Sequence, residues 1–132
     1  MTLRSAYLLL TLALSACAAP SAEKATRAAA DRAHLGIDTR LLDDDLVSFQ
    51  VRMRGTARVD DLDVYARCAA AQYALIRGYD FTRHIRTNTR KEGGVWQADA
   101  VYTISQEFPP GLRSINAEDM VDACKANGVP TV

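Results

Sequence analysis

The chain has 132 residues, of which 48 % are hydrophobic, so it suits one small domain with one core and is too apolar for a disordered chain. Its 16 basic and 16 acidic side chains balance, which excludes a strongly basic nucleic-acid binder and an acidic tail protein. With two histidines, the chain lacks the ligands for a multi-histidine metal site. We therefore expect a small domain without a metal ion or another cofactor.

The N-terminus has the pattern of an export signal. Arg4 supplies a positive charge, and the apolar stretch over residues 6–14 is well short of the ~20 residues that a membrane span needs. The stretch ends in Leu-Ser-Ala-Cys at residues 14–17, which resembles the lipobox of bacterial lipoproteins. Small residues let an extended backbone enter a peptidase, and the Cys17 thiol takes a diacylglyceryl group. We expect a signal peptide over residues 1–16 and a lipid anchor on Cys17.

Two or three acyl chains give lasting attachment to a membrane, so the chain is expected to be anchored. Ala18 follows the cysteine. The resemblance to enterobacterial lipoproteins, in which an aspartate at this position favours retention, implies transfer to the outer membrane, with the domain in the periplasm and the inner membrane as the alternative. Residues 17–35 are rich in alanine and lack an apolar stripe, so this lipidated N-terminus is expected to be a flexible tether. His34 is then an exposed residue of the tether.

Three strands are expected in the domain, which we place at residues 36–132. Residues 46–54 alternate between apolar and polar side chains, which is typical of a half-buried strand. Residues 79–91 and 95–106 form a second and a third strand, joined as a hairpin by the turn at residues 92–94. The predicted core positions are Val47, Phe49, Val51, Met53, Phe81, Ile85, Thr87, Trp96, Ala98, Ala100, Tyr102 and Ile104.

Two helices complete the predicted domain. Asp60 or Asp61 caps the first, which ends near Arg77 and is followed by Gly78 in a left-handed C-terminal position. Its apolar stripe is Leu62, Ala66, Ala69, Tyr73 and Ile76, with Cys68, Leu75 and Val64 on its flank. Asn116 caps the second, whose inward residues are Met120, Val121 and Cys124. The order β-α-β-β-α predicts an α+β two-layer sandwich, a small, mainly antiparallel sheet with both helices on one face.

Two cysteines remain once Cys17 carries lipid. Cys68 and Cys124 each lie on a predicted helix, and an exported compartment is oxidising, so we expect a disulfide between them. Two buried free thiols, which behave as small hydrophobic side chains, are an alternative. A redox pair is a further alternative, although the chain has no Cys-x-x-Cys motif.

Three segments resemble small, uncharacterised proteobacterial lipoproteins that are common in alphaproteobacteria. They are the strand with Arg-Gly at residues 47–55, the alanine-rich helix at residues 65–71, and the Gly-Tyr-Asp-Phe junction at residues 78–81. The resemblance extends from Gly36 to about Ile104, which is about half of the chain, and includes a lipobox. The resemblance implies an outer-membrane lipoprotein and implies no activity.

The sequence offers little support for catalysis, so we expect a protein that is not an enzyme. Ser105 or Ser114 with His84 and an aspartate could form a nucleophile–base set, but the nucleophile elbow and the glycine-rich phosphate loop are missing from the sequence. The aspartates at residues 43–45 resemble calcium ligands, but consecutive residues of an extended chain point in alternate directions. We interpret them as a solvated turn.

The polar face of the predicted sheet is the remaining candidate site. It is expected to hold Arg52, Arg54, His84, Arg86 and Arg90. Guanidinium groups bind phosphates and carboxylates, so one hypothesis is a module for an anionic envelope ligand, either a lipid headgroup or a glycan. The leading hypothesis is a structural or adaptor domain that acts through an envelope protein partner, with an ordinary solvated sheet face. Arg83 conflicts with the pattern, because it shares a predicted face with Phe81 and Ile85.

Overall fold

The computed structural model describes residues 33–55, 58–108, 111 and 114–132. The predicted signal peptide, Cys17 and most of the predicted tether lie outside these residues. The described elements are β1 (Ala33–Leu41), β2 (Leu46–Arg54), α2 (Val59–Ile76), β3 (Phe81–Glu92), β4 (Val95–Ser105), β5 (Ser114–Asn116) and α3 (Ala117–Ala126). None of the described helices is both long and apolar enough to span a membrane.

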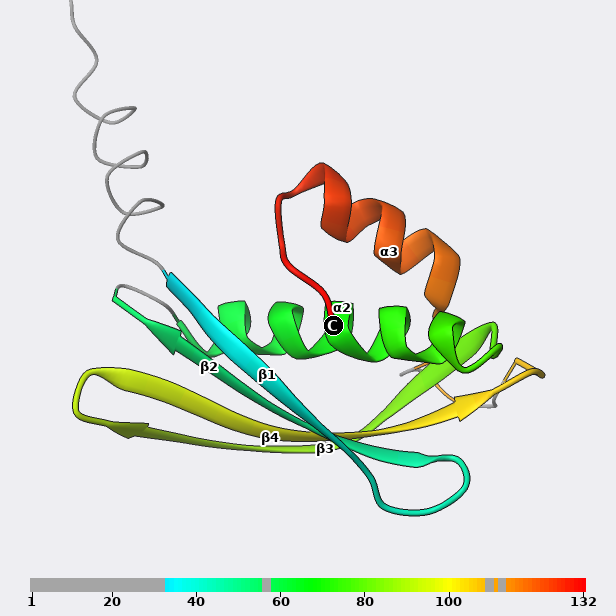
Figure 1. Ribbon diagram of the computed structural model, residues 1–132, viewed down its shortest axis with the longest axis horizontal. Coiled ribbons are helices and arrows are strands. Elements are labelled where there is room, and N and C mark those ends of the chain that lie inside the picture. The colour runs from blue at the N-terminus through cyan, green and yellow to red at the C-terminus, as the bar shows by residue number, and fades with distance from the viewer. Residues whose placement is uncertain (1–32, 56–57, 109–110, 112–113) are drawn as a thin grey trace, which may run out of the picture.

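The five strands form one antiparallel sheet in the order β1-β2-β4-β3-β5 (Figure 1). The predicted α+β class is confirmed. The predicted order β-α-β-β-α is wrong, because the sheet has an additional strand at each edge. β5 has three residues, too few to show an alternating pattern.

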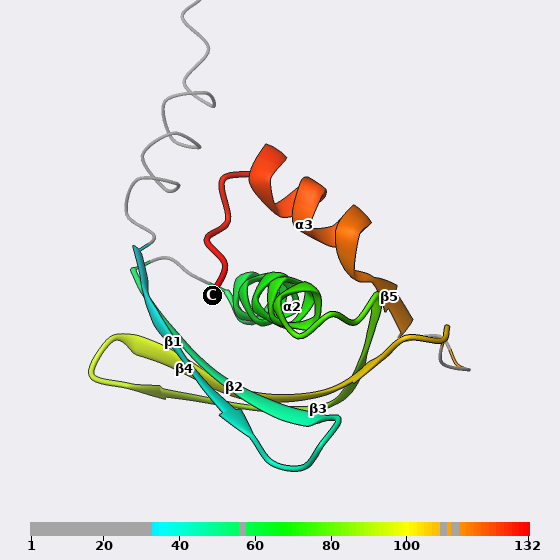
Figure 2. The ribbon, with the colours of Figure 1, turned by 45° about the vertical axis from the view of Figure 1, so that its right-hand side comes forward.

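The sheet curves around α2, and α3 lies farther out, on the side of α2 that faces away from the sheet (Figure 2). Side chains of β2 and β4 fill the space between the sheet and α2, and Phe49, Val51, Ala100 and Ile104 are at most 1 % exposed. Phe49 contacts the rings of Tyr73 and Tyr102 edge to face. We call the surface that contacts α2 the helix face and the opposite surface the open face.

β1 begins at Ala33, inside the segment predicted to be the tether. Its alternation is broken because the register shifts between His34 and Gly36, which places His34 on the helix face opposite Met53. The imidazole of His34 lies edge to face against Tyr65, with the ring centroids 4.6 Å apart. Burial lowers the pKa of His34, and the charge of Asp61 opposes this shift. The prediction that His34 is a tether residue is therefore wrong, although much of its surface remains exposed.

Asp60 or Asp61 was predicted to cap α2, but the N-cap is Arg58, and the carboxylate of Asp61 accepts a hydrogen bond of 2.8 Å from the backbone N–H of Arg58. Gly78 follows the helix with a φ of +81°, as predicted. Ile76 was expected in the core and is 61 % exposed, whereas Ala70, Ala71 and Ala74 are fully buried. The helix is buried on two sides because α3 packs against it opposite the sheet. The predicted two-layer sandwich is therefore wrong, because α3 packs mainly on α2 and not on the sheet.

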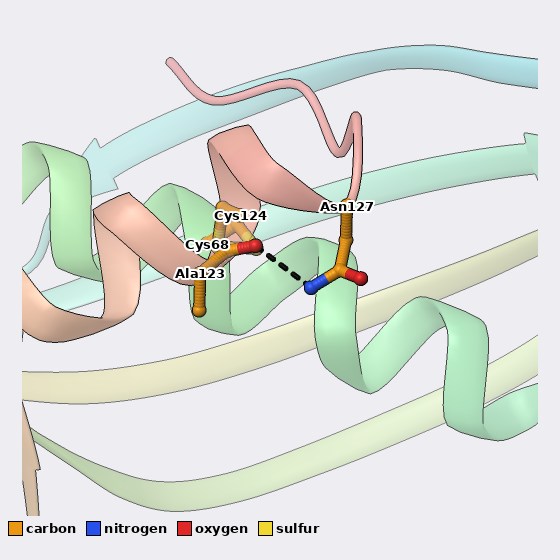
Figure 3. The surroundings of a disulfide bond; sticks show 4 residues. All are labelled: Cys68, Ala123, Cys124 and Asn127. Carbon is orange, nitrogen blue, oxygen red and sulfur yellow. Dashed lines mark hydrogen bonds between the residues drawn. A yellow bond between two sulfur atoms is a disulfide. The ribbon is translucent and has the colours of Figure 1, made fainter.

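α3 is joined to α2 by a disulfide between Cys68 and Cys124, whose Cα atoms lie 6.0 Å apart (Figure 3). The side chain of Asn116 caps α3 by accepting a hydrogen bond from the backbone N–H of Asp119. At the other end, the side-chain amide of Asn127 donates to the carbonyl of Ala123, 2.8 Å away. The disulfide therefore holds a short, capped helix against α2.

Candidate functional site: the open face of the sheet

No described helix covers the open face (Figures 1 and 2). The register places polar residues in rows that cross the strands at its centre. Residues that are partners across an antiparallel pair lie on the same face. The register places Asp38, Gln50, Asp99 and Asn88 in one row, which we call the aspartate row. The next row, which we call the arginine row, contains Gly36, Arg52, Gln97 and Arg90.

Four of the five basic residues predicted for this face lie on it. Arg52 and Arg90 are in the arginine row, and Arg54 is opposite Val95 one row farther on. Arg86 is opposite Val101, on the other side of the aspartate row. All four arginines are exposed, as the two-residue period of the strands predicts.

His84 does not lie on the open face, so its predicted position is wrong. The β3 register shifts between His84 and Arg86, and His84 is opposite Tyr102 on the helix face. Its ring contacts the Tyr102 ring at 5.1 Å, and its Nε2 atom is 2.6 Å from the Thr87 hydroxyl oxygen. The extra residue, Ile85, forms a bulge that changes the face of every following residue.

The same bulge explains the other errors in β3. Phe81 was expected in the core and lies on the open face opposite Ser105, while Thr82 is fully buried opposite Ile104. The Thr82 hydroxyl donates a 2.8 Å hydrogen bond to the carbonyl of Thr103. In the sequence, the predicted alternation placed Arg83 on the same face as Phe81 and Ile85. A charged residue among core positions was the sign that regular alternation fails in this strand.

Arg83 lies on the open face, in register with Thr103 and Ser114. Its guanidinium is beside Gly111, where a Cβ atom would be 3.7 Å from it. The Phe81 ring next to it is in edge-to-face contact with Phe108, at 5.3 Å between centroids. The end of the open face near β5 is therefore partly covered by residues of the β4–β5 connection.

Each arginine near the centre of the open face has a polar neighbour. Arg52 Nη2 is 3.7 Å from Asp38 Oδ2, and Arg86 Nη1 is 3.5 Å from Asp99 Oδ2. The other oxygen of Asp99 accepts a 2.7 Å hydrogen bond from the Ser48 hydroxyl. Because these ion pairs are long and half-exposed, they leave the guanidinium groups able to exchange partners.

Hydrogen bonds join Arg90 and Gln97 at one end of the arginine row. Arg90 donates from Nε and Nη2 to the side-chain oxygen of Gln97, at 2.9 and 2.6 Å. At the other end of the row, Gly36 has no side chain, and a Cβ atom there would lie 3.7 Å from Arg52 Nη2. The guanidinium of Arg52 thus lies close to the bare backbone of β1.

The aspartate and arginine rows line a hollow of ≈ 510 Å³. The side chains that reach it are Asp38, Gln50, Arg52, Asn88, Arg90, Gln97 and Asp99. All of these side chains are polar, and none is aromatic, so the hollow offers hydrogen bonds and charges rather than an apolar or stacking surface. A shallower hollow of ≈ 450 Å³ adjoins it at Arg52 and Gln97.

The residues considered for catalysis or metal binding are not brought together. Ser105 and Ser114 are on the open face, in register with Phe81 and Arg83, whereas His84 is on the helix face. The three aspartates at residues 43–45 form the exposed connection between β1 and β2. Within the described ranges, His, Cys, Asp and Glu side chains form no group of three that could hold a metal ion.

The comparisons with known proteins match the folded part of the chain. The family model described as YNQ4 C-terminal domain matches residues 34–128. A protein of Paracoccus denitrificans described as an uncharacterized 26.9 kDa protein in nqo8 5'region is 36 % identical over 87 residues, which are 66 % of this chain and 34 % of that protein. The chain therefore spans about a third of the length of this relative. No solved structure matches the chain.

Proposed function

We propose that this chain, which belongs to the YNQ4 C-terminal domain family, is a non-enzymatic adaptor domain of the bacterial cell envelope, anchored through Cys17. The observation that carries the proposal is the open face, whose central rows are polar and over which no described helix lies. Its arginines are held in fixed rows by the strand register, which suits recognition of a protein partner.

The proposed location rests on the N-terminal sequence. The Leu-Ser-Ala-Cys box at residues 14–17 supports lipidation, and Ala18 supports sorting to the outer membrane with the domain in the periplasm. Cells labelled with an alkyne-tagged fatty acid should show label on the wild-type chain and none on Cys17→Ser. Equal labelling of the two proteins would refute the anchor.

The adaptor role is tested with the full lipidated chain, using proximity crosslinking from the open face in cells. A photo-crosslinking residue at Asn88 should capture a defined envelope protein, and the same residue at Gln72 on α2 should not. Arg52→Gln with Arg86→Gln should abolish the Asn88 crosslink. Crosslinking that is unaffected by both substitutions would refute the open face as the binding surface.

A second candidate is a module that binds an anionic envelope ligand, either a lipid headgroup or a glycan. It is favoured by Arg52, Arg54, Arg86 and Arg90 sharing one face. Binding of the purified chain to anionic lipid vesicles, or to cell-wall glycan, should weaken steeply between low and high salt, because exposed charges are screened. Binding that does not depend on salt would favour the adaptor role instead.

A further inference from the structure

The charges that line the central hollow are balanced. Arg52 and Arg90 contribute two positive charges, and Asp38 and Asp99 contribute two negative charges, so the formal sum is +2 − 2 = 0. The arginines outside the hollow make the rest of the face basic, including Arg54 and Arg86. A purely anionic ligand therefore gains little from the hollow itself, because it meets two carboxylates beside the two guanidinium groups.

The charges in the hollow are also separated by sign. Both arginines lie in the arginine row, and both aspartates lie in the aspartate row. Adjacent rows on one face are two residues apart along each strand, which is about 7 Å. The hollow thus has a positive edge and a negative edge, and a ligand that binds both edges must displace the long ion pairs of Arg52 with Asp38 and of Arg86 with Asp99.

The positive edge has the geometry to hold a carboxylate. Arg52 on β2 and Arg90 on β3 flank Gln97 on β4, and they are two strand spacings, or about 10 Å, apart at their Cα atoms. Arg90 leans toward Gln97, whereas the guanidinium of Arg52 lies over β1 beside Gly36 and Asp38 and must turn toward Gln97 to share a carboxylate with Arg90. Arg90 retains Nη1 for a ligand while Nε and Nη2 bind Gln97. Arg52 can bind a carboxylate in place of its long ion pair with Asp38.

The negative edge has the geometry to hold an ammonium group. The aspartate row provides carboxylate and amide oxygens from three neighbouring strands, at Gln50, Asp99 and Asn88, with Asp38 beside them on β1. An ammonium group has three donors and no acceptor, so it needs a group of oxygen atoms of this kind.

We infer that the hollow binds a zwitterionic ligand of the short-peptide type, with its carboxylate at Arg52 and Arg90 and its terminal ammonium group at Asp38 and Asp99. This inference rests on the proposed function, because it takes the open face as the binding surface. It specifies the ligand of that surface as one whose two opposite charges are separated by about the distance between the two rows.

The test uses small probes and the full lipidated chain in a nonionic detergent. ε-Aminocaproate, whose extended length roughly matches the row spacing, should bind in saturation-transfer NMR. Glycine is too short to reach both rows, and caproate lacks the ammonium group, so both should bind at least about fivefold more weakly. Equal binding of caproate would refute the ammonium site, and absence of binding by ε-aminocaproate would refute the inference as a whole.

Two variants and one control assign the binding to the two rows. Arg90→Gln and Asp38→Asn should each weaken ε-aminocaproate binding by about fivefold or more, because each removes one charged contact. Arg54→Gln is the matched control, since Arg54 is on the same face and outside the lining of the hollow. If the control weakens binding as much as the two variants do, the hollow is not the site. The crosslinking experiment tests the proposed function separately. If every small probe failed to bind, loss of the Asn88 crosslink in the double variant Arg52→Gln with Arg86→Gln would still support that function.

Discussion

His84 and Arg86 are two positions apart in β3 and lie on opposite faces of the sheet. His84 is in contact with Tyr102 on the helix face, while Arg86 is opposite Val101 and forms an ion pair with Asp99 on the open face. In a regular strand, residues at this spacing share a face. The bulge at Ile85 therefore removes an imidazole from the open face and leaves that face with arginines as its only basic groups among the described residues of β2 and β3.

Deletion of Ile85 should be tolerated, because the pairing on either side of the bulge is continuous without it. His84 would remain opposite Tyr102 and Arg86 opposite Val101, and Ile85 is already 40 % exposed. We expect the free energy of unfolding, measured with urea, to fall by about 1 kcal/mol or less.

Deletion of Gln50 is the contrasting control. It would move one half of β2 to the opposite face and expose Phe49 or bury Arg52, at a cost of several kcal/mol. If the two deletions destabilise the chain equally, the assignment of Ile85 as the extra residue is wrong.

The disulfide between Cys68 and Cys124 should make a large contribution to stability. It closes a loop with a sequence separation of 56 residues, for which the chain-entropy argument gives roughly 4 kcal/mol. Cys68→Ala with Cys124→Ala should lower the urea midpoint markedly, and reductant should lower the wild-type midpoint and leave the variant unchanged. Both thiols reacting with an alkylating agent in the native protein without reductant would contradict the bond.

Stability should fall at high pH because of Tyr102. Burial raises the pKa of Tyr102 to about 12, with a lowering effect of the Arg67 charge and a raising effect of the Asp63 charge. The unfolded chain then loses this proton from about pH 10, while the folded chain keeps it until about pH 12. Unfolding is therefore favoured as the pH rises through this window, by up to about 3 kcal/mol.

Absorbance of the phenolate measures this titration directly. Tyr102→Phe should remove the phenolate that forms near pH 12 from the absorbance titration. It should also flatten the dependence of the unfolding free energy on pH between about 10 and 12. An unchanged pH dependence in this variant would show that another group is responsible.

The ion pairs of the open face should contribute little to stability. In the pair of Arg86 with Asp99, the two side chains are 50 % and 39 % exposed, and the charged atoms are 3.5 Å apart. Arg86→Gln should change the unfolding free energy by less than about 1 kcal/mol, measured with urea at low and high salt. A larger loss would mean that Arg86 is part of the folded framework, and its substitution could then not be used to test binding.

The sequence alone determined the elements whose patterns are local. The two-residue period of β2 predicted its bounds and its buried side chains, and Gly78 and Asn116 predicted one end of each helix. The same period placed Arg52 and Arg54 together, because alternation within one strand needs no information from elsewhere in the chain.

The tertiary structure decided what depends on residues far apart in the sequence. The bulges at Leu35 and Ile85 set the faces of β1 and β3. The histidines beside them contact tyrosines that are distant in the sequence, His34 with Tyr65 and His84 with Tyr102. Ala70, Ala71 and Ala74 are buried because packing against α3 supplies a second covered side of α2. The separation of arginines and aspartates into neighbouring rows likewise arises from the pairing of four strands, since register is a property of the sheet and not of a single strand.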